Sequence, residues 1–140
     1  MNLWVLDTDH VSLFQQNHPL VVQRVAMKNP EELGVTIITA EEQLRGRFNT
    51  IRRASSSSDL VLAYSKLQLT LDYYSTINLL NFNQRAENIY SNLRHQKIRV
   101  GTQDLRIAAI VLSQGGILVT RNQRDFVQIP NLILENWTVP

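Results

Sequence analysis

The sequence predicts an α/β domain in which a central, mainly parallel β-sheet is flanked by helices in three layers. Two observations support this fold class. Short apolar runs typical of buried strands alternate with segments of helical periodicity, and Pro, Gly, Asn or Ser residues separate many of them. This alternation favours parallel strands joined by helices. Because the 140 residues contain no long linker and no internal repeat, we expect one domain covering residues 1–140.

Short apolar segments are expected to form the strands. They are rich in aliphatic and β-branched residues, as is usual for strands that are covered on both faces. In chain order they are residues 2–6, 33–38, 77–82, 117–120 and 132–135.

Helical periodicity predicts the segments between these strands. After the first strand we expect two short helices, interrupted at His18-Pro19, of which Thr8 or Asp9 caps the first. Two later helices are expected over residues 83–96 and 102–114.

Two longer helices are expected on either side of the loop Ser55–Ser58. The first follows the second strand, and its expected inner face carries Leu44, Phe48 and Ile51. The second begins near Asp59, and its expected inner stripe consists of Leu60, Ala63, Leu67, Leu71 and Tyr74.

The composition excludes several classes of protein. The absence of Cys removes disulfides, thiolate nucleophiles and Cys-ligated zinc together. Hydrophobic residues make up 44% of the sequence, yet no apolar run approaches the roughly 18 residues of a membrane-spanning helix. We see no leader with a basic start and an apolar centre, so we expect a cytoplasmic protein.

Acidic residues follow apolar strands or open helices at widely separated points of the chain. Asp7 ends the first strand, Glu42 comes shortly after the second, and Asp104 lies in the first turn of a predicted helix. Asn122 and Asp125 follow the fourth strand. Because the C-terminal ends of parallel strands share one edge of a sheet, we expect a pocket of carboxylates suited to a hard divalent cation.

Helix capping is an alternative explanation for most of these residues. The candidate caps and their acidic neighbours are Thr39 with Glu42, Thr102 beside Asp104, and Asn122 with Asp125. Asp7 is harder to explain in this way, since an ionised carboxylate at the end of an apolar strand is costly without a compensating partner.

Basic residues gather in clusters, although the net charge is only +2 and the pI about 9.2. The clusters are Arg45, Arg47, Arg52 and Arg53; Arg94, Lys97 and Arg99; and Arg121 with Arg124. A basic rim around an acidic pocket suits a phosphodiester substrate. Ordinary solvated helix faces explain each cluster equally well.

Four segments, in order along essentially the whole chain, resemble the motifs of PIN domains. The resemblance is closest to the VapC-type toxin ribonucleases of bacterial toxin–antitoxin pairs. The segments are Leu6-Asp7-Thr8-Asp9, residues 39–46, Gly101–Asp104 with Ala108 and Ala109, and residues 119–126. Four motifs in sequence are specific, whereas one would be weak.

The resemblance implies a three-layer PIN-like fold and cleavage of RNA that depends on Mg²⁺ or Mn²⁺. Asp7, Glu42 and Asp104 match the family's metal-binding acids and are the expected catalytic residues. Expected accessory residues are Asp9, Thr120, Asn122 and Asp125, and the residues expected to contact RNA phosphates are Arg45, Arg121 and Arg124. The family also implies a small antitoxin partner, a homodimer, and structured RNA such as transfer RNA as substrate.

Two departures from the family pattern concern the metal site. Asp9 stands where such chains usually have Asn, and Asn122 stands where Asp is frequent. These departures leave open whether one or two metals bind, and whether Asn122 or Asp125 serves the fourth acidic position.

Two other functions remain open from the sequence. Leu6-Asp7-Thr8-Asp9 also resembles the nucleophile motif of haloacid-dehalogenase phosphatases, with Lys97 as the required lysine, although the acidic pair of that family is missing. A catalytically weak RNA-binding or scaffolding domain of the same fold is the second alternative, supported by Asn122. His10, His18 and His95 lack the spacing of metal ligands, so we expect no histidine-based mechanism.

Overall fold

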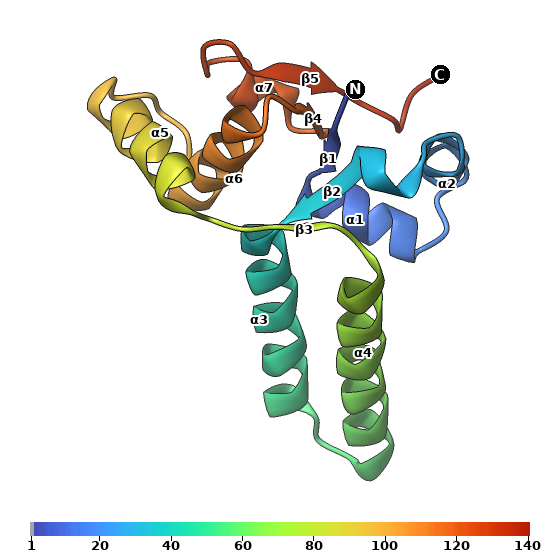
Figure 1. Ribbon diagram of the computed structural model, residues 1–140. Coiled ribbons are helices and arrows are strands. Elements are labelled where there is room, and N and C mark those ends of the chain that lie inside the picture. Colours follow the sequence, from blue (N-terminus) through green and yellow to red (C-terminus); the bar gives the residue numbers. More distant parts are fainter. Residues whose placement is uncertain (1) are drawn as a thin grey trace.

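The computed structural model describes residues 2–140 and contains a five-stranded sheet with helices on both sides (Figure 1). The strands are β1 (Trp4–Leu6), β2 (Leu33–Thr36), β3 (Leu79–Leu80), β4 (Ile117–Val119) and β5 (Ile133–Glu135). Their order across the sheet is β3-β2-β1-β4-β5, and every adjacent pair is parallel. The predicted parallel α/β fold is therefore confirmed.

Every connection between consecutive strands contains at least one helix, and the connection between β4 and β5 is the shortest. The helices are α1 (Thr8–Gln15), α2 (Pro19–Ala26), the 3-10 helix η1 (Pro30–Glu32), α3 (Ile37–Arg53), α4 (Ser57–Thr76), α5 (Gln84–His95), α6 (Thr102–Ser113) and α7 (Gln123–Phe126). Periodicity predicted neither of the short helices η1 and α7, because elements of three or four residues give none. Only the capping pattern of Asn122 and Asp125 pointed to α7. None of the described helices is long and apolar enough to cross a membrane.

Two hydrophobic cores cover the two faces of the sheet. One lies against α5, α6 and α7 and includes Val5, Tyr90, Ile107, Leu118 and Phe126. The other lies against α1 and α2 and includes Leu6, Val11, Val21, Val119 and Trp137. Successive residues of a strand point to opposite faces. Neighbours such as Val5 and Leu6 therefore enter different cores, and both are buried.

The boundary between β2 and α3 lies two residues earlier than the sequence predicted. β2 ends at Thr36, and Ile37 and Ile38 form the first turn of α3. These β-branched residues resemble a strand in sequence. At a helix start there is no preceding turn to crowd their side chains, so they are tolerated there, and Ile38 is buried in the core.

The helices α3 and α4 form a hairpin that extends away from the sheet (Figure 1). Ala63 and Thr70 of α4 are buried. Phe48, Leu60 and Leu71, which were predicted to face inward, have exposed fractions of 48%, 42% and 47%. That prediction was wrong because, beyond the sheet, only the facing sides of the two helices cover each other.

Candidate active site

The C-terminal ends of β1 and β4 mark the point where the chain reverses its direction across the sheet. β2 and β3 lie on one side of β1, and β4 and β5 lie on the other. Ligand sites of parallel α/β sheets collect at such a point. Asp7 follows β1 here, and its backbone N–H donates to the carbonyl of Val119 at 2.9 Å.

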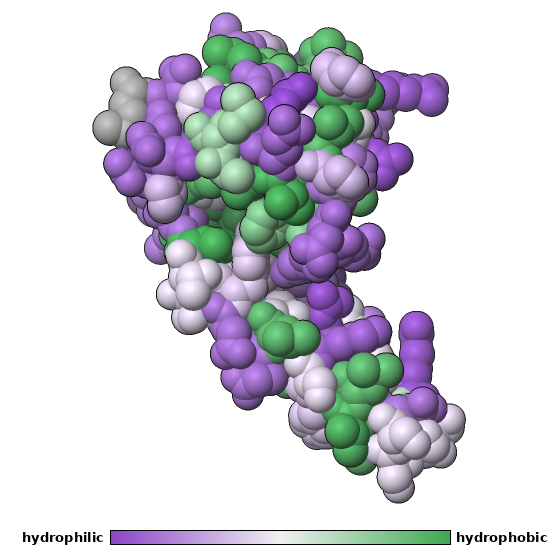
Figure 2. Space-filling model, turned by 90° about the vertical axis from the view of Figure 1, so that its right-hand side faces the viewer, coloured by the Kyte–Doolittle hydropathy of each residue, from purple (hydrophilic) through white to green (hydrophobic). Residues whose placement is uncertain are grey.

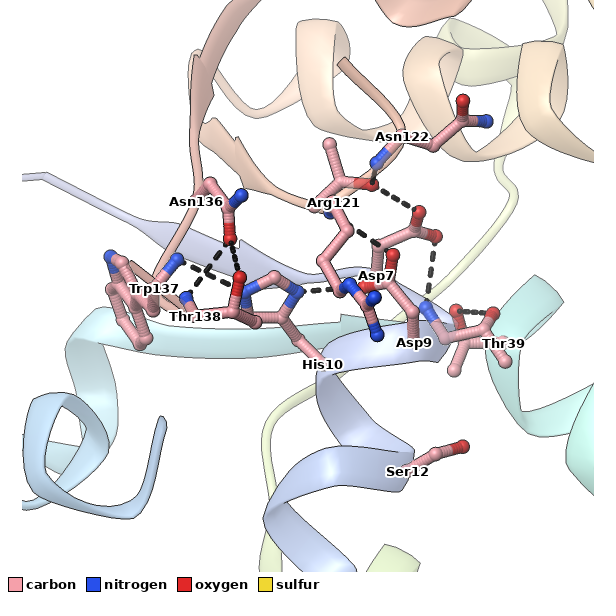
Figure 3. Close-up of polar contacts among 12 residues, drawn as sticks. Asp7, Asp9, His10, Ser12, Thr39, Arg121, Asn122, Asn136, Trp137 and Thr138 are labelled. Carbon is pink, nitrogen blue, oxygen red and sulfur yellow. Dashed lines mark hydrogen bonds and ion pairs between the residues drawn. The ribbon is translucent and has the colours of Figure 1, made fainter. Parts of the chain in front are cut away.

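The carboxylate of Asp7 is buried and held from two sides. Its Oδ1 accepts from the backbone N–H of Thr8 at 2.9 Å, and its Oδ2 accepts from the hydroxyl of Thr120 at 2.8 Å. The Thr120 oxygen in turn accepts from the backbone N–H of Asn122 at 3.0 Å (Figure 3). Asp7 is thus the N-cap of α1, so the prediction that Thr8 or Asp9 fills this position was wrong.

The electrostatic environment of Asp7 disfavours its ionised form. Burial, followed by the negative charge of Asp9, raises the pKa of Asp7 from 3.8 to about 7, and Asp104 adds to the rise. The hydrogen bonds from Thr120 and Thr8 lower this pKa but do not offset the burial. A nearby cation would relieve both the desolvation and the repulsion.

Glu42 reaches the site from the second turn of α3. Its Oε1 accepts from the hydroxyl of Thr8 at 2.9 Å, and the Thr8 oxygen lies 3.0 Å from that of Thr39. The predicted capping box of Thr39 and Glu42 was wrong, because the helix begins earlier. Thr36 is the N-cap, and its hydroxyl oxygen accepts from the backbone N–H of Thr39 at 3.2 Å.

Asp104 lies in the first turn of α6 and is half-buried. Burial raises its pKa, and the charges of Glu42, Asp125 and Asp9 raise it further, in that order. These carboxylates are therefore close enough to repel one another. The prediction that Thr102 caps this helix was wrong, since Thr102 is its first residue and Gly101 is the N-cap.

Asn122 and Asp125 both belong to the segment after β4. Asn122 is the N-cap of α7, as the sequence predicted, but its side chain makes no capping hydrogen bond. The charge of Asp125 acts on Asp104. Asn122 carries no charge, so only Asp125 of this pair adds negative charge near Asp104.

Asp9 is fixed by a histidine that the sequence gave no reason to select. Its Oδ1 lies 2.7 Å from Nδ1 of His10, and its Oδ2 accepts from the backbone N–H of Arg121 at 3.0 Å. His10 is fully buried, and its Nε2 accepts from the backbone N–H of Trp137 at 3.1 Å (Figure 3). The only available signal was its position directly after Asp9.

The predicted RNA-contacting arginines are all exposed. Arg45 forms an ion pair with Glu41 at 2.9 Å, one turn away on α3. Arg121 and Arg124 follow β4 beside the acidic cluster and make no ion pair with any residue in the range 2–140.

The chemistry of these donors fits a hard cation that is held partly through water. All of the converging groups are oxygen donors, which Mg²⁺ and Mn²⁺ accept, and Mg²⁺ usually keeps several waters. Among residues 2–140, no three His, Cys, Asp or Glu side chains lie close enough together to hold a metal ion directly. A cation at this site would therefore be held directly by at most two of these side chains and through water by the others.

Solved structures share this fold over nearly the whole chain. DNA-bound VapBC from Salmonella typhimurium superposes with a TM-score of 0.81 at 22% identity, covering 98% of this chain and 99% of that one. VapBC2 from Rickettsia felis, bound to a DNA fragment from its promoter, gives a TM-score of 0.74 at 25% identity and covers 96% and 98%. The parallel sheet with helices on both faces is thus the three-layer fold of PIN-like domains.

Curated relatives identify the family within this class. The tRNA(fMet)-specific endonuclease VapC of Salmonella typhimurium is 30% identical over 118 residues, which cover 73% of this chain and 89% of the relative. Ribonuclease VapC1 of Haemophilus influenzae is 26% identical over 138 residues, 97% of this chain and 98% of the relative. Ribonuclease VapC2 of Rickettsia felis is 39% identical over 77 residues, about half of each chain. No protein-family model matches.

The chain belongs to the VapC family of toxin endoribonucleases. This membership leaves the phosphatase interpretation of Asp7 and Asp9 without support, and it favours an enzyme over a scaffolding domain. Nucleases of this family generally use divalent metal ions.

Proposed function

We propose that this chain cleaves RNA with Mg²⁺ or Mn²⁺ at the edge of the sheet where Asp7, Glu42 and Asp104 converge. The observation that carries the proposal is the buried Asp7 carboxylate, whose pKa is raised to about 7 among other acids. Keeping such a group ionised at neutral pH lowers the stability of the fold, and a cation bound in the pocket would offset that cost. A functional site explains why the arrangement is kept.

Each acidic side chain has a distinct role in the proposal. Asp7 and Asp104 hold the cation directly or through water, and Glu42 completes the site or orients the attacking water. When bound, the cation would lower the pKa of a coordinated water and stabilise the charge that develops on the phosphate. Thr120 and Thr8 keep Asp7 and Glu42 in place through the hydrogen bonds described above.

Residues around the cation pocket complete the proposed site. Asp9 and Asp125 add negative charge, and Asn122 stands beside them at the start of α7. Arg45, Arg121 and Arg124 contact phosphates of the RNA, since exposed guanidinium groups beside an acidic pocket can hold the backbone that the pocket cleaves.

Partners follow from the relatives. We propose that the substrate is a structured RNA such as transfer RNA, as the name of the Salmonella relative indicates. We further propose that the chain acts in the cytoplasm as a homodimer and binds a small antitoxin, since the similar structures are VapBC complexes. Apolar side chains exposed on the α3–α4 hairpin support contact with another protein; they are Phe48, Val61, Leu62, Tyr64 and Leu69. Figure 2 shows patches of hydrophobic surface along this part of the molecule.

Cleavage by matched variants tests the proposed function. The purified chain should cut transfer RNA in Mg²⁺ and stop in EDTA, and Asp104→Asn should reduce the rate at least about 100-fold. Asp72→Asn removes a carboxylate from the exposed side of α4 and should cut like the wild type. Metal-independent cutting, or full activity of Asp104→Asn, would refute the assignment of the site.

A further inference from the structure

His10 connects the acidic pocket with the C-terminal segment of the chain. It is a fully buried residue of α1, directly after Asp9 in the sequence. One of its ring nitrogens faces the Asp9 carboxylate and the other faces the backbone of Trp137 (Figure 3). The function proposed above does not use it.

The hydrogen bonds of His10 determine its tautomer. Nε2 accepts from the backbone N–H of Trp137 at 3.1 Å, so this nitrogen carries no proton. The proton of the neutral ring therefore lies on Nδ1, which donates to Oδ1 of Asp9 at 2.7 Å. The two hydrogen bonds therefore run in one direction: the backbone N–H of Trp137 donates to His10, and His10 donates to Asp9.

Both ends of this link are anchored. On one side, the second oxygen of Asp9 accepts from Arg121 N–H at 3.0 Å, so the carboxylate is held by donors from two segments. On the other side, the buried Trp137 donates through its indole nitrogen to Glu135 at 2.9 Å. The orientation of Asp9 is thus set by contacts that reach back to β5.

Asp9 lies close enough to the proposed cation site for its charge to act on Asp7 and Asp104. Its negative charge contributes to the raised pKa values of both Asp7 and Asp104. Both of its oxygens already accept a hydrogen bond, so its remaining lone pairs are available for waters of a hydrated cation.

We propose that His10 is a positioning residue, which fixes Asp9 as an additional carboxylate of the cation pocket and links that pocket to the C-terminal segment around Trp137. This inference rests on the proposed metal-dependent function. Groups that hydrogen-bond to the ligands of a metal and fix their orientation typically contribute about 10- to 100-fold to metal affinity or activity.

A double-mutant cycle tests whether His10 acts through Asp9. Calorimetric titration with Mn²⁺ should give about tenfold weaker binding for Asp9→Asn and for His10→Gln. The double variant should bind as weakly as either single variant, because His10→Gln can have no further effect once the carboxylate that His10 orients is gone. His18→Gln is the matched control: His18 also accepts a backbone N–H, from Val21 at 3.4 Å, and its loss should leave Mn²⁺ affinity unchanged.

A purely structural role for His10 predicts other results. Wild-type Mn²⁺ affinity in His10→Gln would overturn the inference, as would an effect that simply multiplies with that of Asp9→Asn. If the wild type itself neither binds Mn²⁺ nor cuts RNA in its presence, the proposed function fails. If the wild type binds Mn²⁺ and cuts RNA but the effects of Asp9→Asn and His10→Gln on Mn²⁺ affinity are independent, only the role of His10 is rejected.

A measurement on the wild type covers the case in which His10→Gln does not fold. Saturating Mg²⁺ should slow hydrogen exchange of the Trp137 backbone amide by about threefold or more, since the cation stabilises the linked arrangement of Asp9, His10 and Trp137. The Val21 amide, bonded to His18, is the internal control and should exchange at an unchanged rate. Equal behaviour of the two amides in a protein that cuts RNA with Mg²⁺ would overturn the inference.

Discussion

Replacing Asp7 by Asn should stabilise the metal-free protein at neutral and alkaline pH. The pKa of Asp7 is raised on folding, so its contribution to stability is most favourable below 3.8 and is lost as pH rises to about 7. A rise of this size corresponds to roughly 4 kcal/mol, as an upper bound. Asn cannot accept both hydrogen bonds that Asp7 receives, which costs about 1 kcal/mol.

The expected net gain is therefore about 2–3 kcal/mol at pH 8, or a rise in Tm of roughly 10 °C. Thermal unfolding should be followed by circular dichroism in EDTA, at constant ionic strength, from pH 4 to pH 8. The stability of the wild type should fall relative to that of Asp7→Asn as pH increases, and Mg²⁺ should stabilise only the wild type strongly. Parallel curves for the two proteins across this range would show that Asp7 does not carry a raised pKa in the folded protein.

Three further changes address the surroundings of Asp7. Thr120→Val removes the hydroxyl that donates to Asp7, so urea unfolding should show a loss of about 1–3 kcal/mol, whereas an unchanged midpoint would contradict the role of this bond. Asn122→Asp should tighten Mn²⁺ binding in calorimetry if the side chain faces the pocket, and no change would leave Asn122 only as the start of α7. Arg121→Gln with Arg124→Gln should weaken RNA binding and reduce its salt dependence while Mn²⁺ affinity stays constant; an unaltered salt slope would exclude phosphate contacts.

The parallel sheet was predictable because the hydrophobic pattern of the sequence distinguishes buried strands from the helices between them. Alternation of apolar runs with helical periodicity implies parallel strands, and the structure confirms them. The ends of the elements and the burial of individual residues were harder to predict. Ile37 and Ile38 have the composition of a strand but begin α3, and Phe48 has helical spacing but no covering partner. Composition and periodicity do not encode which neighbouring element covers a residue.

The acidic residues of the site could be selected from their positions after strands, but the groups that orient them could not. The Thr8 hydroxyl donates a hydrogen bond to Glu42 of another segment, and His10 accepts one from the backbone of Trp137, near the other end of the chain. Such contacts arise only when the sheet brings β1, β2 and β5 together. The sequence shows only that His10 follows Asp9, whereas its contact with Trp137 is apparent only in three dimensions.

The carboxylates at this edge of the sheet should bind a divalent cation that RNA cleavage requires. Crystals grown with Mn²⁺ can show whether they do, since anomalous scattering locates the ion without assumptions about its ligands. We expect an anomalous peak beside Asp7 and Asp104, within reach of Glu42 directly or through water, that is lost in Asp7→Asn. A peak elsewhere, or none near these residues in a protein that cuts RNA with Mn²⁺, would contradict it.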